Sequence, residues 1–187
     1  MELQGERLIP ADVQRTWSAL NDPDTLKSCI AGCETLERTG DNSFRCVMAV
    51  KVGPVSARFN GKLEMTDVQP PRGYTMSFEG QGGAAGFAKG SSQVSLEPDG
   101  ENTRLRYTAK AQVGGKMAQI GSRLVDAAAR KTADDFFAAF EARLREAAPG
   151  VAPAPVTAAA QPRAAGQTWW WVVAAIIVAM AVYWIVR

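Results

Sequence analysis

The sequence predicts an α+β fold in which a curved antiparallel sheet of about seven strands surrounds a long C-terminal helix, the helix-grip arrangement. About six consecutive segments between Glu34 and Gln112 alternate apolar and polar residues and are joined by short turns, as in an antiparallel meander. A one-sided helical stretch follows over residues 116–147, and one more alternating segment precedes the meander at residues 2–9. A helix with one apolar stripe must cover an apolar surface, and the sheet face is the largest one available.

Two short helices are expected between the first strand and the meander. Pro10 is favoured in a first helical turn, which predicts a helix over residues 10–20. The Asn21-Asp22-Pro23 step ends that helix, and a second is expected over residues 24–30. This order places both helices on the chain between the first strand and the remaining six.

Three segments of different composition divide the chain. Residues 1–147 form the helix-grip domain, and residues 148–168 are an Ala/Pro-rich linker with too few apolar side chains to build a core. Residues 169–186 are uninterruptedly apolar, and as a helix they extend about 27 Å, close to the thickness of a bilayer core of about 30 Å. A buried core helix is the alternative. Aromatic residues stand at both ends of the run, as in membrane-interface belts: Trp169, Trp170, Trp171, Tyr183 and Trp184.

The location of the domain is predicted from the same segments. The first residues of the chain lack the apolar region of a secretory signal. We therefore expect a single-pass C-terminal anchor in the cytoplasmic membrane, with the domain in the cytoplasm.

The composition argues against several classes of function. The sequence has no histidine, which excludes His-based catalytic triads and His-containing zinc sites. A net charge of +2 with scattered basic residues does not favour nucleic-acid binding. Cys29, Cys33 and Cys46 are expected to be free thiols. We predict no catalytic residue, no metal site and no covalent cofactor.

Four separated stretches carry a family resemblance. They are residues 52–61 (VGPVSARFNG), 70–74 (PPRGY), 86–90 (GFAKG) and 113–124 (VGGKMAQIGSRL). In this order they resemble the family of the G subunit of carbon monoxide dehydrogenase, a branch of the START-like (SRPBCC) superfamily, over about residues 1–147. Ala31 stands where the family usually has proline.

The resemblance implies an accessory protein rather than an enzyme. Members of the family are thought to tether a molybdenum-containing carbon monoxide dehydrogenase, or a related hydroxylase, to the cytoplasmic membrane. We expect this protein to recruit such an enzyme and to help its electrons reach the quinone pool. A cyclase- or dehydratase-type START-like enzyme, and a lipid-transfer or scaffold protein without a redox partner, are the alternatives.

Small residues in the predicted sheet and helix favour an apolar cavity between them. Gly61, Gly80 and Gly82 in the sheet, and Gly121 with Ala127–Ala129 in the helix, either let the helix approach the sheet closely or leave space that larger side chains would fill. The second interpretation is favoured here. A bound quinone or lipid would suit such a cavity, although each apolar residue taken singly is more often plain core. The predicted lining residues are Phe59, Leu63, Met65, Met76, Phe78, Leu105, Tyr107, Leu124 and Phe137.

Two glycine-rich stretches are candidates for a gate over the cavity or a partner-docking loop. Residues 80–90 lack the spacing of a phosphate-binding loop, so a corner at the sheet rim is the structural alternative. Gly114 and Gly115 precede the long helix, where a turn with positive φ, or an anion site at the helix N-terminus, would need them. The predicted gate or partner-loop residues are Gly86, Phe87, Lys89, Gly114, Gly115 and Lys116.

Overall fold

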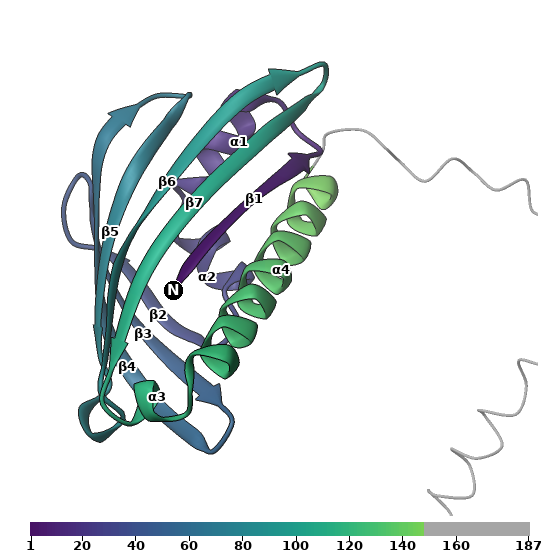
Figure 1. The fold of residues 1–187 in the computed structure, drawn as a ribbon. Coiled ribbons are helices and arrows are strands. Elements are labelled where there is room, and N and C mark those ends of the chain that lie inside the picture. Colours follow the sequence, from purple (N-terminus) through teal and green to yellow (C-terminus); the bar gives the residue numbers. More distant parts are fainter. Residues whose placement is uncertain (148–187) are drawn as a thin grey trace, which may run out of the picture. The chain divides into compact units, whose positions relative to one another are not determined.

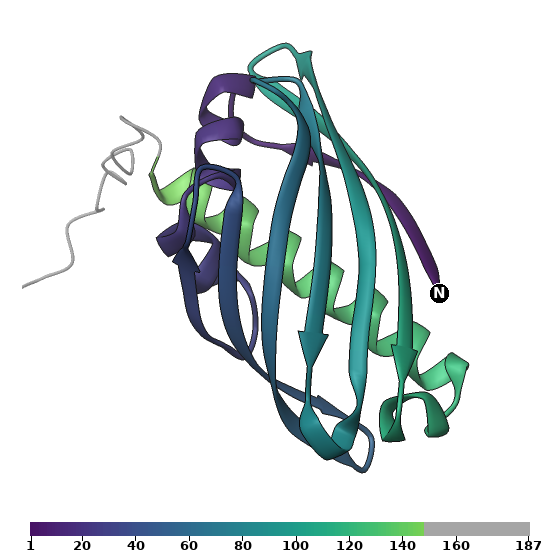
Figure 2. The ribbon, with the colours of Figure 1, turned by 90° about the vertical axis from the view of Figure 1, so that its left-hand side faces the viewer.

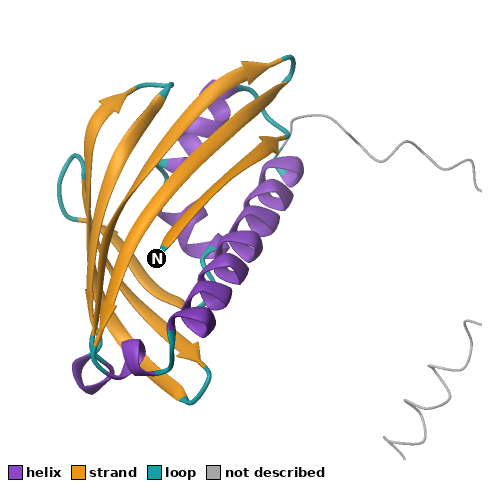
Figure 3. Cartoon of the chain, viewed as in Figure 1, coloured by secondary structure: helices purple, strands orange, loops and turns teal. Residues whose placement is uncertain are grey.

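Seven strands and four α-helices account for most of residues 1–147, the part of the chain that the computed structural model describes (Figures 1 and 3). The strands are β1 (Glu2–Ile9), β2 (Cys33–Arg38), β3 (Ser43–Val52), β4 (Val55–Gln69), β5 (Gly73–Gln81), β6 (Phe87–Asp99) and β7 (Asn102–Gly114). The helices are α1 (Val13–Leu20), α2 (Pro23–Cys29), α3 (Lys116–Gln119) and α4 (Ser122–Glu146), with a 3₁₀ turn, η1, at Gly83–Ala85.

The strands form one antiparallel sheet in the order β1-β7-β6-β5-β4-β3-β2. The sheet curves around α4, so that one face is turned toward the helix and the other is turned away from it (Figure 2). We call these the inner and outer faces. The predicted α+β fold, with about seven strands and a C-terminal helix, is confirmed.

The first two helices begin where a carboxylate caps them. Asp12 accepts a hydrogen bond from the Arg15 backbone N–H at 2.9 Å, so α1 begins at Val13 rather than at Pro10 as predicted. Asp22 caps α2 in the same way, with a 3.0 Å bond from the Thr25 N–H. Burial of Trp17 and Leu20 holds α1 against the interior.

The single long helix predicted over residues 116–147 is wrong in one respect. The chain forms the short helix α3, turns at Gly121 and continues as α4. Gly121 has φ +94°, a backbone conformation that favours glycine and interrupts a helix. The break leaves Met117 and Ile120 in a different apolar cluster from the residues of α4.

Two apolar clusters occupy opposite ends of the interior. The first joins α1, α2 and the C-terminal half of α4 to the sheet, and Phe140, Leu105 and Ile9 are its most deeply buried members, at 0%, 1% and 0% exposure. The second joins Phe59, Ala85 and Met117 to the ends of β3, β4 and β7. The sheet therefore contributes to two separate cores rather than to one continuous core.

The predicted linker (148–168) and transmembrane helix (169–186), with its aromatic residues, lie outside the described residues. Within residues 1–147, no helix combines the length and apolar character needed to cross a membrane.

Candidate functional site

Small residues lie between the two apolar clusters on the inner face of the sheet. Gly61 pairs directly with Gly80, and Gly90 pairs with Ala111, across neighbouring strands. The Phe78 ring lies over Gly90, where an added Cβ would stand 2.8 Å from the ring. We call Gly61, Phe78, Gly80, Gly90 and Ala111 the inner belt. Four of its five residues have little or no side chain, so this part of the sheet projects little apolar volume toward α4.

Helix α4 covers the inner belt without lying directly on it. Apart from α3, which precedes it in the chain, the closest backbone neighbours of α4 are α2, β1 and β3. In the strand order, β1 and β3 lie at or near the two ends of the sheet. Side chains must fill the distance between α4 and the central strands β4 to β6. Where those side chains are small, apolar surface stays accessible, and Phe78 is accordingly only half-buried.

The residues predicted to line a cavity differ in their burial. Phe59, Met65, Leu105 and Phe137 are buried, the first in the second cluster and the other three in the first. Leu63, Met76, Phe78 and Tyr107 are half-buried. Leu124 is 42% exposed, and its side chain lies beside Gly53 in the β3–β4 turn. These half-buried side chains point to the inner face, within the belt (Phe78) or beside it, and are the part of the predicted set that a ligand could contact.

A polar group that the sequence did not single out lies at the seam between β1 and α4. The guanidinium of Arg7 lies 5.5 Å from the centroid of the Phe137 ring and forms an ion pair with Asp134. The Tyr107 ring lies 5.2 Å from that of Phe137 and covers Gly5. The Nε of Arg7 is buried and has no hydrogen-bond partner within residues 1–147, which is costly for a donor.

The strand pattern contained a signal for Arg7. In β1, residues 3, 5, 7 and 9 are more buried than the residues between them. An arginine at an inward position of an alternating strand is therefore a sequence feature that points to the interior.

The structure brings together most of the predicted gate residues. Gly86 approaches Gly114 so closely that an added Cβ would stand 1.9 Å from the Gly114 carbonyl oxygen. Phe87 pairs with Gly114 and covers it, and Gly115, with φ +72°, leads into α3 at Lys116. The positive φ predicted for this turn is confirmed. Lys89 lies apart from this group, on the outer face.

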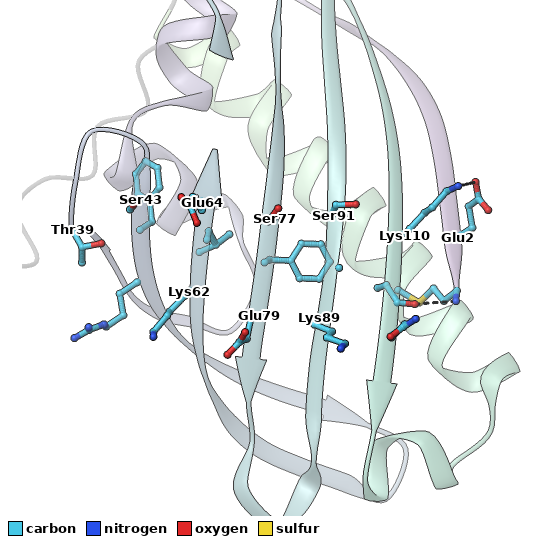
Figure 4. A pocket seen from close by; sticks show the side chains of 18 residues that line it. Glu2, Thr39, Ser43, Lys62, Glu64, Ser77, Glu79, Lys89, Ser91 and Lys110 are labelled. Atoms are coloured by element: carbon cyan, nitrogen blue, oxygen red, sulfur yellow. Dashed lines mark hydrogen bonds and ion pairs between the residues drawn. The ribbon is translucent and has the colours of Figure 1, made fainter. Parts of the chain in front are cut away.

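The outer face carries a groove of about 940 Å³ that runs across β3 to β7 (Figure 4). Two rows of outward side chains flank it, and the strand backbone between them forms its floor. One, the basic row, is Arg45, Lys62, Glu79, Lys89 and Gln112. The other, the hydroxyl row, is Ser43, Glu64, Ser77, Ser91 and Lys110. We call this feature the outer groove.

Comparison with known proteins assigns the chain to a family. The family model for the G subunit of carbon monoxide dehydrogenase (CoxG) matches residues 5–145. The chain belongs to this family. The resemblance predicted from four stretches of sequence is therefore confirmed, and a CoxG protein is by its family description a subunit of a carbon monoxide dehydrogenase system.

Solved structures agree with the fold. A conserved protein from Geobacillus kaustophilus has 32% identity and a TM-score of 0.74, and the match covers 78% of this chain and 96% of that one. A protein from Thermus thermophilus has 22% identity, a TM-score of 0.60 and coverage of 79% and 100%. An aromatase/cyclase from Streptomyces sp. R1128 has 12% identity, a TM-score of 0.62 and coverage of 81% and 99%. The last two show the START-like fold alone. No curated protein matches the chain.

The cysteines of this CoxG chain are free thiols in the structure, as predicted. Burial raises the pKa of Cys46, and the nearby Cys33 raises it further. Burial also raises the pKa of Cys33, against a smaller opposing effect of Lys27. Both thiols are therefore poor nucleophiles near neutral pH, because the thiolate is the reactive form. Residues 1–147 contain no cluster of acidic and cysteine side chains arranged to hold a metal ion.

Proposed function

We propose that this CoxG protein is a membrane-anchored accessory subunit. It recruits a molybdenum hydroxylase of the carbon monoxide dehydrogenase type to the cytoplasmic membrane and binds a lipophilic molecule, a quinone or a lipid, at the inner belt. By presenting a quinone to the enzyme, it helps electrons reach the quinone pool. Membership of the CoxG family supports the association with the enzyme, and the apolar run at residues 169–186 supports the anchor.

The proposal of a bound ligand rests on the half-buried apolar surface between the sheet and α4. Leu63, Met76, Phe78 and Tyr107 point to the inner face yet stay only partly covered. Full burial of an exposed apolar side chain contributes about 1.5–3 kcal/mol. These side chains are already partly covered, so a ligand that covers the rest of their surface gains a fraction of that from each. The thioether of Met76 can adapt to ligands of different shape.

The polar groups of Arg7 and Tyr107, at the seam between β1 and α4, suggest the orientation of the ligand. A quinone has carbonyl oxygens that accept hydrogen bonds on an otherwise apolar ring. The unpaired Nε of Arg7 is a donor at the edge of the apolar surface, and Tyr107 brings a hydroxyl to the same edge. We expect the carbonyl end to face Arg7 and Tyr107, and the apolar remainder to lie along Phe78 and Met76.

The linker supplies the reach that delivery requires. Pro-rich chains extend about 3.1 Å per residue, so residues 148–168 can span up to about 60 Å. A quinone cannot leave the bilayer unaided. A tethered domain that binds it could carry it to an electron-exit site above the membrane.

Mass spectrometry of the full-length protein, purified in mild detergent, tests the ligand. We expect an isoprenoid quinone or a lipid to co-purify with the wild type. The Gly80→Leu substitution should remove it, because a Cβ at this position meets ordinary packing distances, 3.7 Å to Phe59, while the longer side chain enters the belt. Gln81→Leu, one residue away on the outer face, is the matched control and should keep the ligand. If the wild type carries no ligand in repeated preparations, the proposal of a bound ligand is wrong. If the Gly80→Leu variant still carries the ligand, the ligand binds somewhere other than the inner belt.

Binding to the enzyme is tested separately. The full-length protein in nanodiscs should bind the purified carbon monoxide dehydrogenase complex of the same organism, and the enzyme should then co-sediment with the discs. If the enzyme sediments equally well with empty discs, the protein does not recruit it.

A cyclase- or dehydratase-type enzyme is the second candidate. Tyr107 and Asp134 place groups that can exchange a proton beside the apolar surface, as acid–base catalysis requires, and Arg7 adds a fixed positive charge. The discriminating measurement is the chemical identity of a ligand recovered after long incubation with the protein. Recovery of an unchanged molecule argues against the enzyme, whereas a dehydrated or cyclised product argues against a purely accessory role.

A further inference from the structure

The basic row of the outer groove places like charges opposite one another. Arg45 of β3 and Lys62 of β4 are direct cross-strand partners. Directly opposed like charges destabilise a sheet. Glu79 and Lys89 follow on the next two strands in the same register (Figure 4). Within the described residues, Arg45, Lys62 and Lys89 form no ion pair.

Two other arginines on the same face, Arg104 and Arg106, are paired with carboxylates. Arg104 bonds Glu6 at 2.7 Å and Asp99 at 2.6 Å. Arg106 bonds Glu6 at 2.8 Å and Glu97 at 2.9 Å. Each arginine in that half of the outer face has two carboxylate partners, whereas the three cations of the basic row share one carboxylate, that of Glu79, which lies opposite both Lys62 and Lys89.

The opposite side of the groove offers hydroxyl groups and little net charge, because Glu64 and Lys110 in the hydroxyl row carry opposite charges. Ser43, Ser77 and Ser91 place hydroxyl groups along the hydroxyl row, and Lys110 in that row is within 3.6 Å of Glu2. The two rows are two residues apart along each strand, about 6.7 Å, which exceeds the spacing of about 4.8 Å between neighbouring extended chains and so admits one such chain. A planar lipid surface would not enter such a groove.

We propose that the outer groove binds an extended acidic segment of the partner enzyme. The proposal rests on the proposed function, because the partner is the recruited hydroxylase. Strands lie about 4.8 Å apart, so the groove from β3 to β7 is about 19 Å long and accommodates about six extended residues. One carboxylate of the segment lies between Arg45 and Lys62, and a second lies at Lys89.

The position of Glu79 restricts the sequence of that segment. Glu79 stands between Lys62 and Lys89 in the basic row, so it repels an acidic side chain at the middle of the segment. The distance from the Arg45–Lys62 pair to Lys89 is about 12 Å, which corresponds to about four extended residues. The bound segment therefore has two acidic residues about four positions apart, with neutral or basic residues between them.

Charge reversal in the full-length protein tests the groove. The probe is the purified carbon monoxide dehydrogenase complex, and the readout is its dissociation constant at several salt concentrations. The R45E/K62E variant should bind at least about tenfold more weakly, with a shallower salt dependence. E79Q should bind about threefold more tightly, because it removes the repelling charge. R130E, an exposed cation on α4, repeats the same type of charge reversal elsewhere and should bind as the wild type does.

The outcomes separate this proposal from the proposed function. A wild type that does not bind the complex overturns both. A wild type that binds, together with an R45E/K62E variant of unchanged affinity, overturns the groove alone. Binding to phosphatidylglycerol vesicles provides the remaining comparison. If R45E/K62E loses vesicle binding but keeps enzyme binding, the groove contacts anionic lipid and the proposal is wrong. Thermal melting of each variant shows whether it is folded.

Discussion

The space between the sheet and α4 is packed differently near α1 and α2 than along the inner belt. At the end near α1 and α2, Phe140 and Ile9 are both 0% exposed, and Leu144 is 3% exposed. Toward α3, the inner belt consists mainly of glycine and alanine, and Leu124 is 42% exposed. The region near α1 and α2 therefore supplies stability, whereas the inner belt, between the two clusters, leaves apolar surface uncovered. A domain that both folds and binds an apolar molecule needs this division, because a fully packed interior has no room for a ligand.

Truncation of one large side chain in each of these two regions should give the largest difference in the free energy of unfolding. Phe140→Ala should lower the free energy of unfolding by about 3–5 kcal/mol, because it leaves a cavity in the first cluster. Leu124→Ala should change it by less than about 0.5 kcal/mol, as for other exposed positions. Urea unfolding followed by circular dichroism measures both. Similar losses of free energy of unfolding in the two variants would show that the two regions are packed alike.

Buried hydroxyls sharpen the same contrast with a smaller effect. At the packed end, Thr103 Oγ1 donates to the Ala11 carbonyl oxygen at 2.7 Å and accepts from Thr16 at 3.2 Å, and both threonines are 0% exposed. Thr103→Val should lower the free energy of unfolding by about 2 kcal/mol, since it leaves buried groups unpaired. Ser92→Ala, at a half-buried inner position, should be nearly neutral in the same unfolding measurement. A clear loss for Ser92→Ala would show that the inner face is more tightly packed there than its burial indicates.

The pH dependence of the free energy of unfolding should reveal the burial of Tyr74, which lies in the first cluster. Burial raises the pKa of Tyr74 to about 12, above its ordinary value of 10.0. Its hydroxyl therefore ionises in the unfolded chain before it does so in the folded chain, and stability is lost as the pH rises from about 10 to about 12. Between pH 9 and pH 11 the wild type should lose about 1.4 kcal/mol more than Tyr74→Phe does. Denaturant unfolding at both pH values measures this, and parallel pH profiles would contradict the burial of the hydroxyl.

Much of the fold could be predicted because its signals are local. The alternation of Tyr74, Met76 and Phe78 with polar residues identifies a strand and assigns each side chain to a face. Gly121 shows where this local reasoning ends. A glycine within a helical pattern costs only about 1 kcal/mol relative to alanine, so the pattern alone did not predict the break between α3 and α4. The positive φ at Gly121 is a property of the folded chain.

The candidate sites divide in the same way. The sequence placed Leu63, Met76 and Tyr107 on the inner face, but it could not show that they remain half-buried. Arg7 and Asp134 are far apart in the sequence, so their pairing at the seam could not be anticipated. The outer groove was not predicted at all, because Arg45, Lys62 and Lys89 come from three separate strands.

The sequence by itself determined the strands, the face to which each residue points, the family and the apolar run at residues 169–186. These features depend on periodicity and local composition, which neighbouring residues fix. Only the tertiary structure decided the strand register and the distance between α4 and the central strands. It also decided that Phe140 is enclosed while Leu124, within the same predicted helix, is exposed. The reason is physical, because burial and the pairing of charges depend on residues brought together from distant parts of the chain.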